Sequence, residues 1–126
     1  MNKLARHFLF CLVLILDFSC SKTSNNNTTN VAGKWFEISA IPSSNYSSCD
    51  FQGSYINFNS NNTYTEFSSC TNNTSIGTYK TVGNTIIVTP NVFPIPVTFN
   101  IISLTTTQLI LEDTFMGSTD RVTYKR

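Results

Sequence analysis

From residue 33 to the C-terminus, the chain consists of short segments in which apolar residues recur at every second position. A period of two is the side-chain period of a β-strand, and no apolar stripe with the helical period is present. The segments are rich in β-branched and aromatic residues, and turn-forming residues separate them. We therefore expect strands near residues 33–41, 51–59, 63–69, 75–82, 84–90, 96–103, 108–114 and 119–126.

The same alternation assigns one face of each strand to the interior, because successive side chains of a strand point to opposite faces. The expected inward residues are mostly apolar and lie two positions apart. They are Ile56, Phe58, Thr65, Phe67, Gly77, Tyr79, Ile86, Val88, Val97, Phe99, Ile101, Leu109, Leu111, Val122 and Tyr124.

Connection lengths indicate how these strands are joined. Short turns at 59–62, 83–84, 105–107 and 116–118 favour sequential antiparallel neighbours, whereas the Pro-rich passage 90–96 predicts a longer loop or an edge. Eight such strands leave two unpaired edges unless the last strand pairs with the first. The predicted fold class is therefore all-β, an eight-stranded antiparallel up-and-down barrel, and the alternative is a flattened β-sandwich of the same strands.

The N-terminus has the pattern of an export signal. Lys3, Arg6 and His7 precede an apolar run at 8–16, which is too short to cross a bilayer. Residues 21–32 are polar, as in a flexible tether. We expect a lipoprotein signal peptide at 1–19, a tether at 20–32 and a barrel domain at 33–126.

Ser19 and Cys20 resemble the lipobox of bacterial lipoproteins, in which the signal is cut before a lipidated Cys. Asp17 and Phe18 depart from the usual lipobox residues. The resemblance implies that Cys20 carries the lipid and anchors the protein in the cell envelope, at the outer membrane, on a side that the sequence does not specify. The alternative is an ordinary signal cut nearby, with Cys20 unmodified.

Two further cysteines, Cys49 and Cys70, remain for the folded domain. Export places them in an oxidising compartment, where a disulfide persists. A hairpin centred near Ser60 would place the two residues opposite each other. The alternative, a metal pair, is weak because two Cys without His make a poor zinc set, and we expect neither a metal nor another cofactor.

Charge and residue content narrow the function. The formal net charge is +1 and no basic block is present, which argues against nucleic acid binding. The only His, His7, lies in the predicted signal, so the mature chain lacks the usual general base and we expect no enzyme. Nothing in the sequence brings two acids together. We expect solvated or rim carboxylates at Glu37, Asp50, Glu66, Glu112, Asp113 and Asp120. The alternative for Glu37 alone, which shares the parity of Trp35, is that it points into the barrel.

The chain from Gly33 to Arg126 resembles the lipocalin-like domain of lipoproteins from Bacteroidetes bacteria. The matching pieces are GKW at the first strand, YINFNSNNTYTEFSSC, GTYKTVGNTIIV and FNIISLTTTQLILED across three hairpins, and VTYKR at the end. The resemblance implies that Trp35 packs at the closed end of the barrel beneath a basic residue of the last strand. Arg126 is the candidate because it shares the parity of Val122 and Tyr124. The alternative is that Trp35 is core and Arg126 a frayed terminus.

The resemblance also implies a monomer that binds a small, mostly apolar molecule inside the barrel, by burial and not by charge. Small inward residues, namely Thr65, Gly77, Thr81 and Ser103, would leave room for it. The alternative is an interaction module that recognises a protein or glycan through its loops, with Phe36, Tyr55 or Tyr64 filling the barrel. Candidate ligand-binding residues are Phe58, Phe67, Tyr79, Phe99 and Tyr124.

Overall fold

The computed structural model of the chain describes residues 30–126. The predicted signal peptide, the predicted lipidation site at Cys20 and the predicted tether up to residue 29 lie outside the described residues. Within residues 30–126, no helix is long and apolar enough to cross a membrane.

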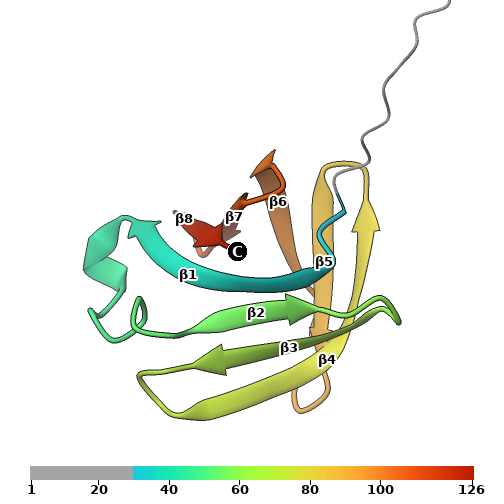
Figure 1. Cartoon of the computed structure of the whole chain (residues 1–126), viewed down its shortest axis with the longest axis horizontal. Helices are drawn as coiled ribbons and strands as arrows, with labels where there is room; N and C mark the ends of the chain where they lie inside the picture. Colours follow the sequence, from blue (N-terminus) through green and yellow to red (C-terminus); the bar gives the residue numbers. More distant parts are fainter. Residues whose placement is uncertain (1–29) are drawn as a thin grey trace, which may run out of the picture.

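Eight antiparallel strands form a closed barrel, in which each strand pairs with its neighbours in sequence and β8 pairs with β1 (Figure 1). This confirms the predicted barrel over the flattened sandwich. Residues 51–54, predicted to begin the second strand, instead precede it in turns and a short link. The elements are β1 (Gly33–Ile41), η1 (Ser43–Asn45), β2 (Tyr55–Phe58), β3 (Thr63–Ser68), β4 (Asn73–Val82), β5 (Thr85–Pro90), β6 (Val97–Leu104), β7 (Gln108–Phe115) and β8 (Ser118–Lys125).

The up-and-down order gives the barrel two distinct ends. The closed end carries the start of β1, the C-terminus and the short β2–β3, β4–β5 and β6–β7 turns. The open end carries the segment 42–54, which holds η1, together with the β3–β4 turn, the β5–β6 loop and the β7–β8 turn. In Figure 1 the segment 42–54 and the β3–β4 turn lie on the same side of the barrel, opposite the start of β1.

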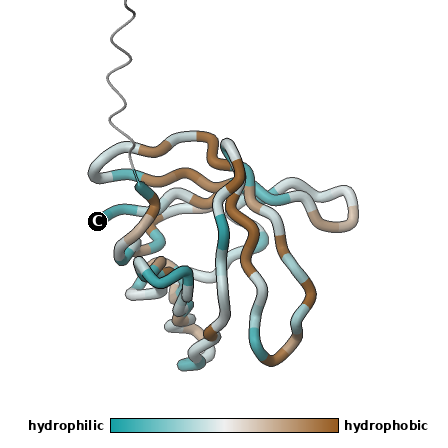
Figure 2. The backbone as a smooth tube through the Cα atoms, turned by 90° about the vertical axis from the view of Figure 1, so that its right-hand side faces the viewer, coloured by the Kyte–Doolittle hydropathy of each residue, from teal (hydrophilic) through white to brown (hydrophobic). Residues whose placement is uncertain are grey.

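The hydrophobic core fills the closed half of the barrel. Its largest fully buried side chains are Trp35, Tyr64, Phe58, Ile86 and Leu109. Figure 2 shows apolar and polar residues following one another along the strands, as expected when one face of each strand is inside. Burying this apolar face is the main driving force for closure of the barrel.

The β2–β3 hairpin has a different register from the predicted one. Phe58 lies opposite Tyr64, and Ile56 lies opposite Glu66. Residues 59–62 connect the two strands, and in this turn the Asn62 N–H donates to the Asn59 carbonyl at 3.1 Å, with Asn62 at φ 64°. The observed pairs centre the hairpin on Asn61 and not on Ser60, which moves the partner of each residue by two positions. The faces follow from the pairs themselves: residues opposite each other share a face, so Tyr64 lies on the inner face with Phe58.

Because of this register, β3 turns Tyr64 and Glu66 inward, and the prediction that Thr65 and Phe67 face the interior was wrong. Phe67 lies on the outer face, where its ring stacks on Tyr55 with 5.5 Å between centroids. Tyr55 in turn contacts the half-exposed ring of Phe36. Of the three aromatic residues expected to compete for the interior, only Tyr64 enters it.

Two β-bulges also change which residues face inward. The β1–β8 ladder shifts between Glu37 and Ser39, so β1 does not keep a strict alternation along its length. The β6–β7 ladder shifts between Ile101 and Ser103. Leu104 consequently lies opposite the fully buried Leu109, and the prediction that Ser103 faces the interior was wrong.

The absence of a side chain at Gly77 makes room for the Tyr64 ring and does not leave an empty cavity. A Cβ atom at this position would lie 2.8 Å from Cε1 of Tyr64 and 2.2 Å from the Thr89 carbonyl oxygen. The Tyr64 ring therefore occupies the room that the missing side chain leaves. The free space in the barrel lies elsewhere.

Candidate functional site

The closed end is sealed by an arginine over a tryptophan. The Trp35 ring is fully buried, and its Nε1–H donates to the Val31 carbonyl at 2.7 Å. The Arg126 guanidinium lies 4.0 Å from the ring centroid, and its Nη2 donates to the Ala32 carbonyl. The barrel is therefore plugged at the end where the chain enters and leaves it.

Gly33 lets the arginine approach this closely. Its φ is +124°, a conformation that favours glycine, and a Cβ atom would lie 3.1 Å from Nη2 of Arg126. Arg121, the other arginine of β8, is on the outer face and pairs with Glu112 at 2.6 Å. The structure thus places Arg126, and not Arg121, against Trp35.

A cavity of about 160 Å³ lies inside the barrel in its open half. It sits between the core and the segment 42–54, and side chains from seven of the eight strands and from that segment line it. The lining residues are Glu37, Tyr46, Ile56, Glu66, Val88, Phe99, Leu111, Asp113, Asp120, Val122 and Tyr124.

Four of these residues are carboxylates, contributed by β1, β3, β7 and β8. The prediction that the acids lie apart as solvated or rim groups was wrong for this set. Register explains the grouping: Glu66 continues the inward parity of Tyr64, and Asp113 lies directly opposite Asp120 across the β7–β8 ladder. The four residues are Glu37, Glu66, Asp113 and Asp120.

The environment of Glu37 disfavours its charged form. The pKa of this carboxyl is raised from 4.5 to about 7. Burial is the main cause, and the negative charges of Asp50 and Glu66 contribute the rest. Its Oε1 atom is buried and accepts no hydrogen bond from the described residues. Burial also raises the pKa of Glu66, and burial together with Asp120 raises the pKa of Asp113.

Two tyrosines complete the polar part of the cavity. Tyr124 lies opposite Glu37 in the β1–β8 ladder, and burial raises the pKa of its hydroxyl well above the ordinary value. Tyr46 comes from the segment 42–54 and stacks on Phe51 with 6.2 Å between centroids. Burial, followed by the charge of Asp120, raises the pKa of Tyr46 to about 12. Both hydroxyls therefore keep their protons at neutral pH.

No basic side chain among residues 30–126 lines the cavity. Lys34 is on the outer face, with its Nζ 3.6 Å from the Tyr55 ring centroid. Lys80 and Lys125 are exposed, Arg121 pairs with Glu112, and Arg126 covers Trp35. In the same part of the chain, no three acidic, His or Cys side chains are arranged to hold a metal ion.

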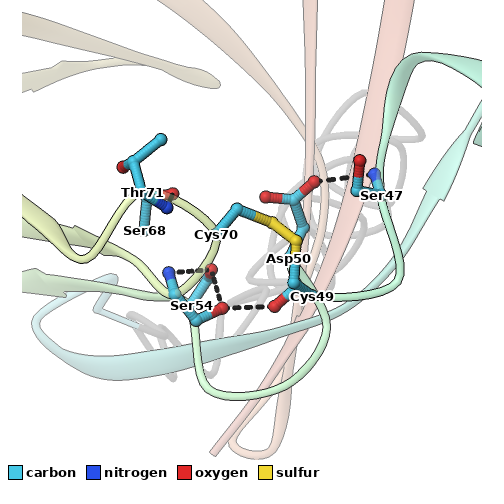
Figure 3. The surroundings of a disulfide bond; sticks show 8 residues. Ser47, Cys49, Asp50, Ser54, Ser68, Cys70 and Thr71 are labelled. Carbon is cyan, nitrogen blue, oxygen red and sulfur yellow. Dashed lines mark hydrogen bonds between the residues drawn. A yellow bond between two sulfur atoms is a disulfide. The ribbon is translucent and has the colours of Figure 1, made fainter.

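A disulfide fixes the segment 42–54 over the open end. Cys49 and Cys70 are bonded, with 5.1 Å between their Cα atoms, and join this segment to the β3–β4 turn (Figure 3). Beside the bond, Ser54 and Ser69 share a hydrogen bond of 2.8 Å between their hydroxyls. The predicted pairing is confirmed, but the two residues lie beyond the ends of the β2–β3 ladder and not within it.

The residues predicted to bind a ligand separate into three groups. Phe99 and Tyr124 line the cavity. Phe58 and Tyr79 belong to the core, with ring centroids 4.8 Å apart, and Phe67 is on the outer face. The residues that sequence reasoning missed are Tyr46 and three of the carboxylates, Glu66, Asp113 and Asp120, while an inward Glu37 was only the alternative. Asp113 lies two positions after the inward Leu111, and Asp120 lies two positions before the inward Val122. Extending the alternation of the strands to these positions would have predicted that both carboxylates face inward.

A larger and more open depression of about 590 Å³ lies near the closed end. Turn and strand-end residues form it, and none of them carries an ionisable side chain. Thr81, one of the small residues expected to leave room inside, borders this depression. Its lining is Asn30, Val31, Thr81, Gly83, Asn84, Ile101, Ile102, Ser103 and Leu104.

A closed up-and-down barrel with one plugged end and one cavity-bearing end defines the class of this protein. The model of the lipocalin-like domain family matches residues 19–111, which is more than half of the chain. The chain therefore belongs to the lipocalin-like domain family. No curated protein and no solved structure matches it.

Proposed function

We propose that this protein binds a small molecule with an apolar part in the cavity of its open half, and that it is a binding protein and not an enzyme. The observation that carries the proposal is the cavity of about 160 Å³ inside a barrel whose other end is plugged. Ile56, Phe99 and Leu111 supply apolar wall for such a ligand. Concave, partly apolar sites with a few polar groups are typical of small-molecule binding.

Filling the cavity tests this function. A fluorescent neutral apolar probe is titrated into the wild type and two variants. Phe99→Trp places a larger side chain in the cavity and so reduces its volume. Phe93→Trp changes an exposed residue of the β5–β6 loop and is the control. We expect saturable binding that weakens in Phe99→Trp and is unchanged in Phe93→Trp. Equal binding by all three proteins would mean that the probe binds outside the barrel.

We further propose that the domain is exported and held at the membrane by lipid on Cys20. The support is the leader sequence and the Ser19-Cys20 pair, together with a polar tether that lets the barrel extend from the bilayer. Metabolic labelling with a fatty-acid analogue should mark the wild type and leave Cys20→Ala unmarked and soluble. Cys11→Ala is the control, and failure to label the wild type would refute the anchor.

The alternative function is recognition of a protein or glycan through the loops. Exposed apolar residues at the open end favour it, since Val92, Phe93 and Ile95 of the β5–β6 loop are all more than two-thirds exposed. A glycan array probed with the wild type and with Phe93→Ser tests the glycan form of this function. Binding that depends on Phe93, without any uptake of the apolar probe, would favour recognition through the loops.

A further inference from the structure

We propose that the ligand of this cavity is a small organic cation, a protonated amine that carries an apolar or aromatic group. This inference rests on the proposed function, since it assigns the chemistry of the ligand in the same cavity. It also replaces the expectation that the ligand is held by burial and not by charge.

The first argument is uncompensated negative charge. The cavity gathers Glu37, Glu66, Asp113 and Asp120, and no basic side chain of residues 30–126 faces them. Glu37 is the carboxylate with a buried and unpartnered oxygen, whereas Glu66 keeps an exposed side chain at the edge of the cavity. Withdrawing the Glu37 carboxylate from water without a partner costs free energy, which the protein recovers when a cation enters. The buried Oε1 of Glu37, which accepts no hydrogen bond from the described residues, is an acceptor placed for a donor that the protein does not supply.

The second argument separates an organic cation from a metal ion. A metal site needs several oxygen ligands converging on one point, and no such group exists among residues 30–126. The carboxylates are instead distributed around a cavity with aromatic walls from Tyr46, Phe99 and Tyr124. An ammonium group can bind a carboxylate while its substituent packs on these rings, which themselves attract cations.

The same arrangement selects against other ligands. An anion would be repelled by the carboxylates, and a neutral apolar molecule would displace water from them without replacing its hydrogen bonds. A neutral hydroxyl can donate one such bond, but without the charge that strengthens the bond from an ammonium group. Asp120 is already oriented by Asn45, whose Nδ2 donates to its Oδ1 at 2.9 Å. Asn45 and Tyr46 both lie in the segment that the Cys49–Cys70 disulfide holds in place, so this wall of the cavity is preorganised.

A matched set of three probes tests the charge of the ligand. Isothermal titration calorimetry compares 2-phenylethylamine, which is cationic, with 2-phenylethanol, which is neutral, and 3-phenylpropanoate, which is anionic. The protein is the exported chain with its disulfide intact. We expect the amine to bind about tenfold or more tightly than the alcohol, and the anion not to bind.

Variants locate the effect in the cavity. Glu37→Gln and Glu66→Gln each remove one inward carboxylate, whereas Glu112→Gln removes an outer-face carboxylate one position from Asp113. We expect the first two to weaken amine binding by about tenfold and Glu112→Gln to change it by less than about twofold. Gln keeps the shape of the side chain, so a loss of affinity reports the charge.

Three outcomes would overturn the inference. Equal affinity for amine and alcohol, or equal losses in Glu66→Gln and Glu112→Gln, would show that cavity charge does not select the ligand, and would leave small-molecule binding intact. Displacement of the amine by Ca²⁺ but not by Na⁺ at the same ionic strength would assign the carboxylates to a metal. If none of the three probes and no neutral apolar probe binds, the proposed function fails as well.

Discussion

Asp113 of β7 and Asp120 of β8 are direct cross-strand partners on the inner face of the barrel, where both line the cavity. Like charges directly opposite each other destabilise a sheet. The open half of the barrel therefore has an unfavourable electrostatic free energy that the packed closed half lacks. At the closed end the charged residue, Arg126, is instead matched to the Trp35 ring. The fold thus places a charge matched to an aromatic ring at one end and acidic groups without a basic partner at the other.

Stability should fall as the pH rises through the titration of Glu37. Its pKa is about 7 in the folded protein against an ordinary value of 4.5, so the folded state binds more protons between these values. The contribution of Glu37 to the unfolding free energy is therefore greatest below about pH 4.5, declines up to about pH 7 and is constant at higher pH. Burial raises the pKa of Glu66 and Asp113, which act in the same direction.

Thermal unfolding near pH 5 and near pH 8 measures this effect. Glu37→Gln should raise the Tm at the higher pH by several degrees and flatten the pH dependence, whereas Glu112→Gln should leave the dependence unchanged. Wild-type stability that increases over this interval would contradict the assignment of a raised pKa to the cavity carboxyls.

Amine binding should tighten over the same pH interval, provided that the ligand itself stays protonated. The titratable groups that line the cavity are Glu37 of β1, Glu66 of β3, Asp113 of β7, Asp120 and Tyr124 of β8, and Tyr46 of the segment 42–54. Asp50 of the same segment does not line the cavity, but its negative charge acts on Glu37. The tyrosines stay protonated throughout, and the cavity gains negative charge from Glu37, whose pKa is about 7. Binding near pH 7 should also release protons, measured as a dependence of the calorimetric enthalpy on the buffer.

Removal of the Arg126 side chain should destabilise the closed end. Arg126→Ala loses the contact with Trp35 and the hydrogen bond to the Ala32 carbonyl, and we expect a loss of about 0.5–2 kcal/mol from the cation–π contact. The emission of Trp35, the only Trp in the chain, should shift as water reaches its ring. Lys125→Ala, at an exposed position, is the control, and equal losses in both variants would argue against a specific plug.

Gly77→Ala should be strongly destabilising although its backbone φ lies outside the left-handed region. The added Cβ would meet the Thr89 carbonyl oxygen at 2.2 Å and the Tyr64 ring at 2.8 Å, so backbone and core must both move. We expect a loss of about 1–3 kcal/mol in urea unfolding. Thr78→Ala, at the next and exposed position of β4, should change stability little; a similar small effect of Gly77→Ala would contradict the tight packing.

Loss of the disulfide should loosen the open end without unfolding the barrel. Cys49→Ser with Cys70→Ser removes a link between residues 21 positions apart, and we expect a loss of about 3 kcal/mol. The far-UV circular dichroism should keep its β-sheet form at room temperature because no strand ladder contains either Cys. Free thiols at both Cys49 and Cys70 in the denatured, unreduced wild type, located by alkylation and peptide mapping, would contradict the bond itself.

Much of the fold was predictable from sequence because its determinants are local. The period of two identifies strands, the Asn and Gly turns identify hairpins, and eight short hairpin-linked strands favour closure. The contact between Trp35 and Arg126 at the closed end, next to Gly33, was predicted from the family resemblance and from the parity of the last strand. These inferences needed only residues that are close in sequence, or the two ends of one closed sheet.

The acidic cavity was decided by the tertiary structure. Its carboxylates come from β1, β3, β7 and β8, and only the exact strand register and barrel closure bring them together. The turn at 59–62 sets the β2–β3 register, and a slip of one residue would exchange Glu66 for Phe67 inside the barrel. Local pattern fixes which segments are strands, but pairing between distant segments decides which side chains share the interior, because each side chain's face depends on the register of its neighbours.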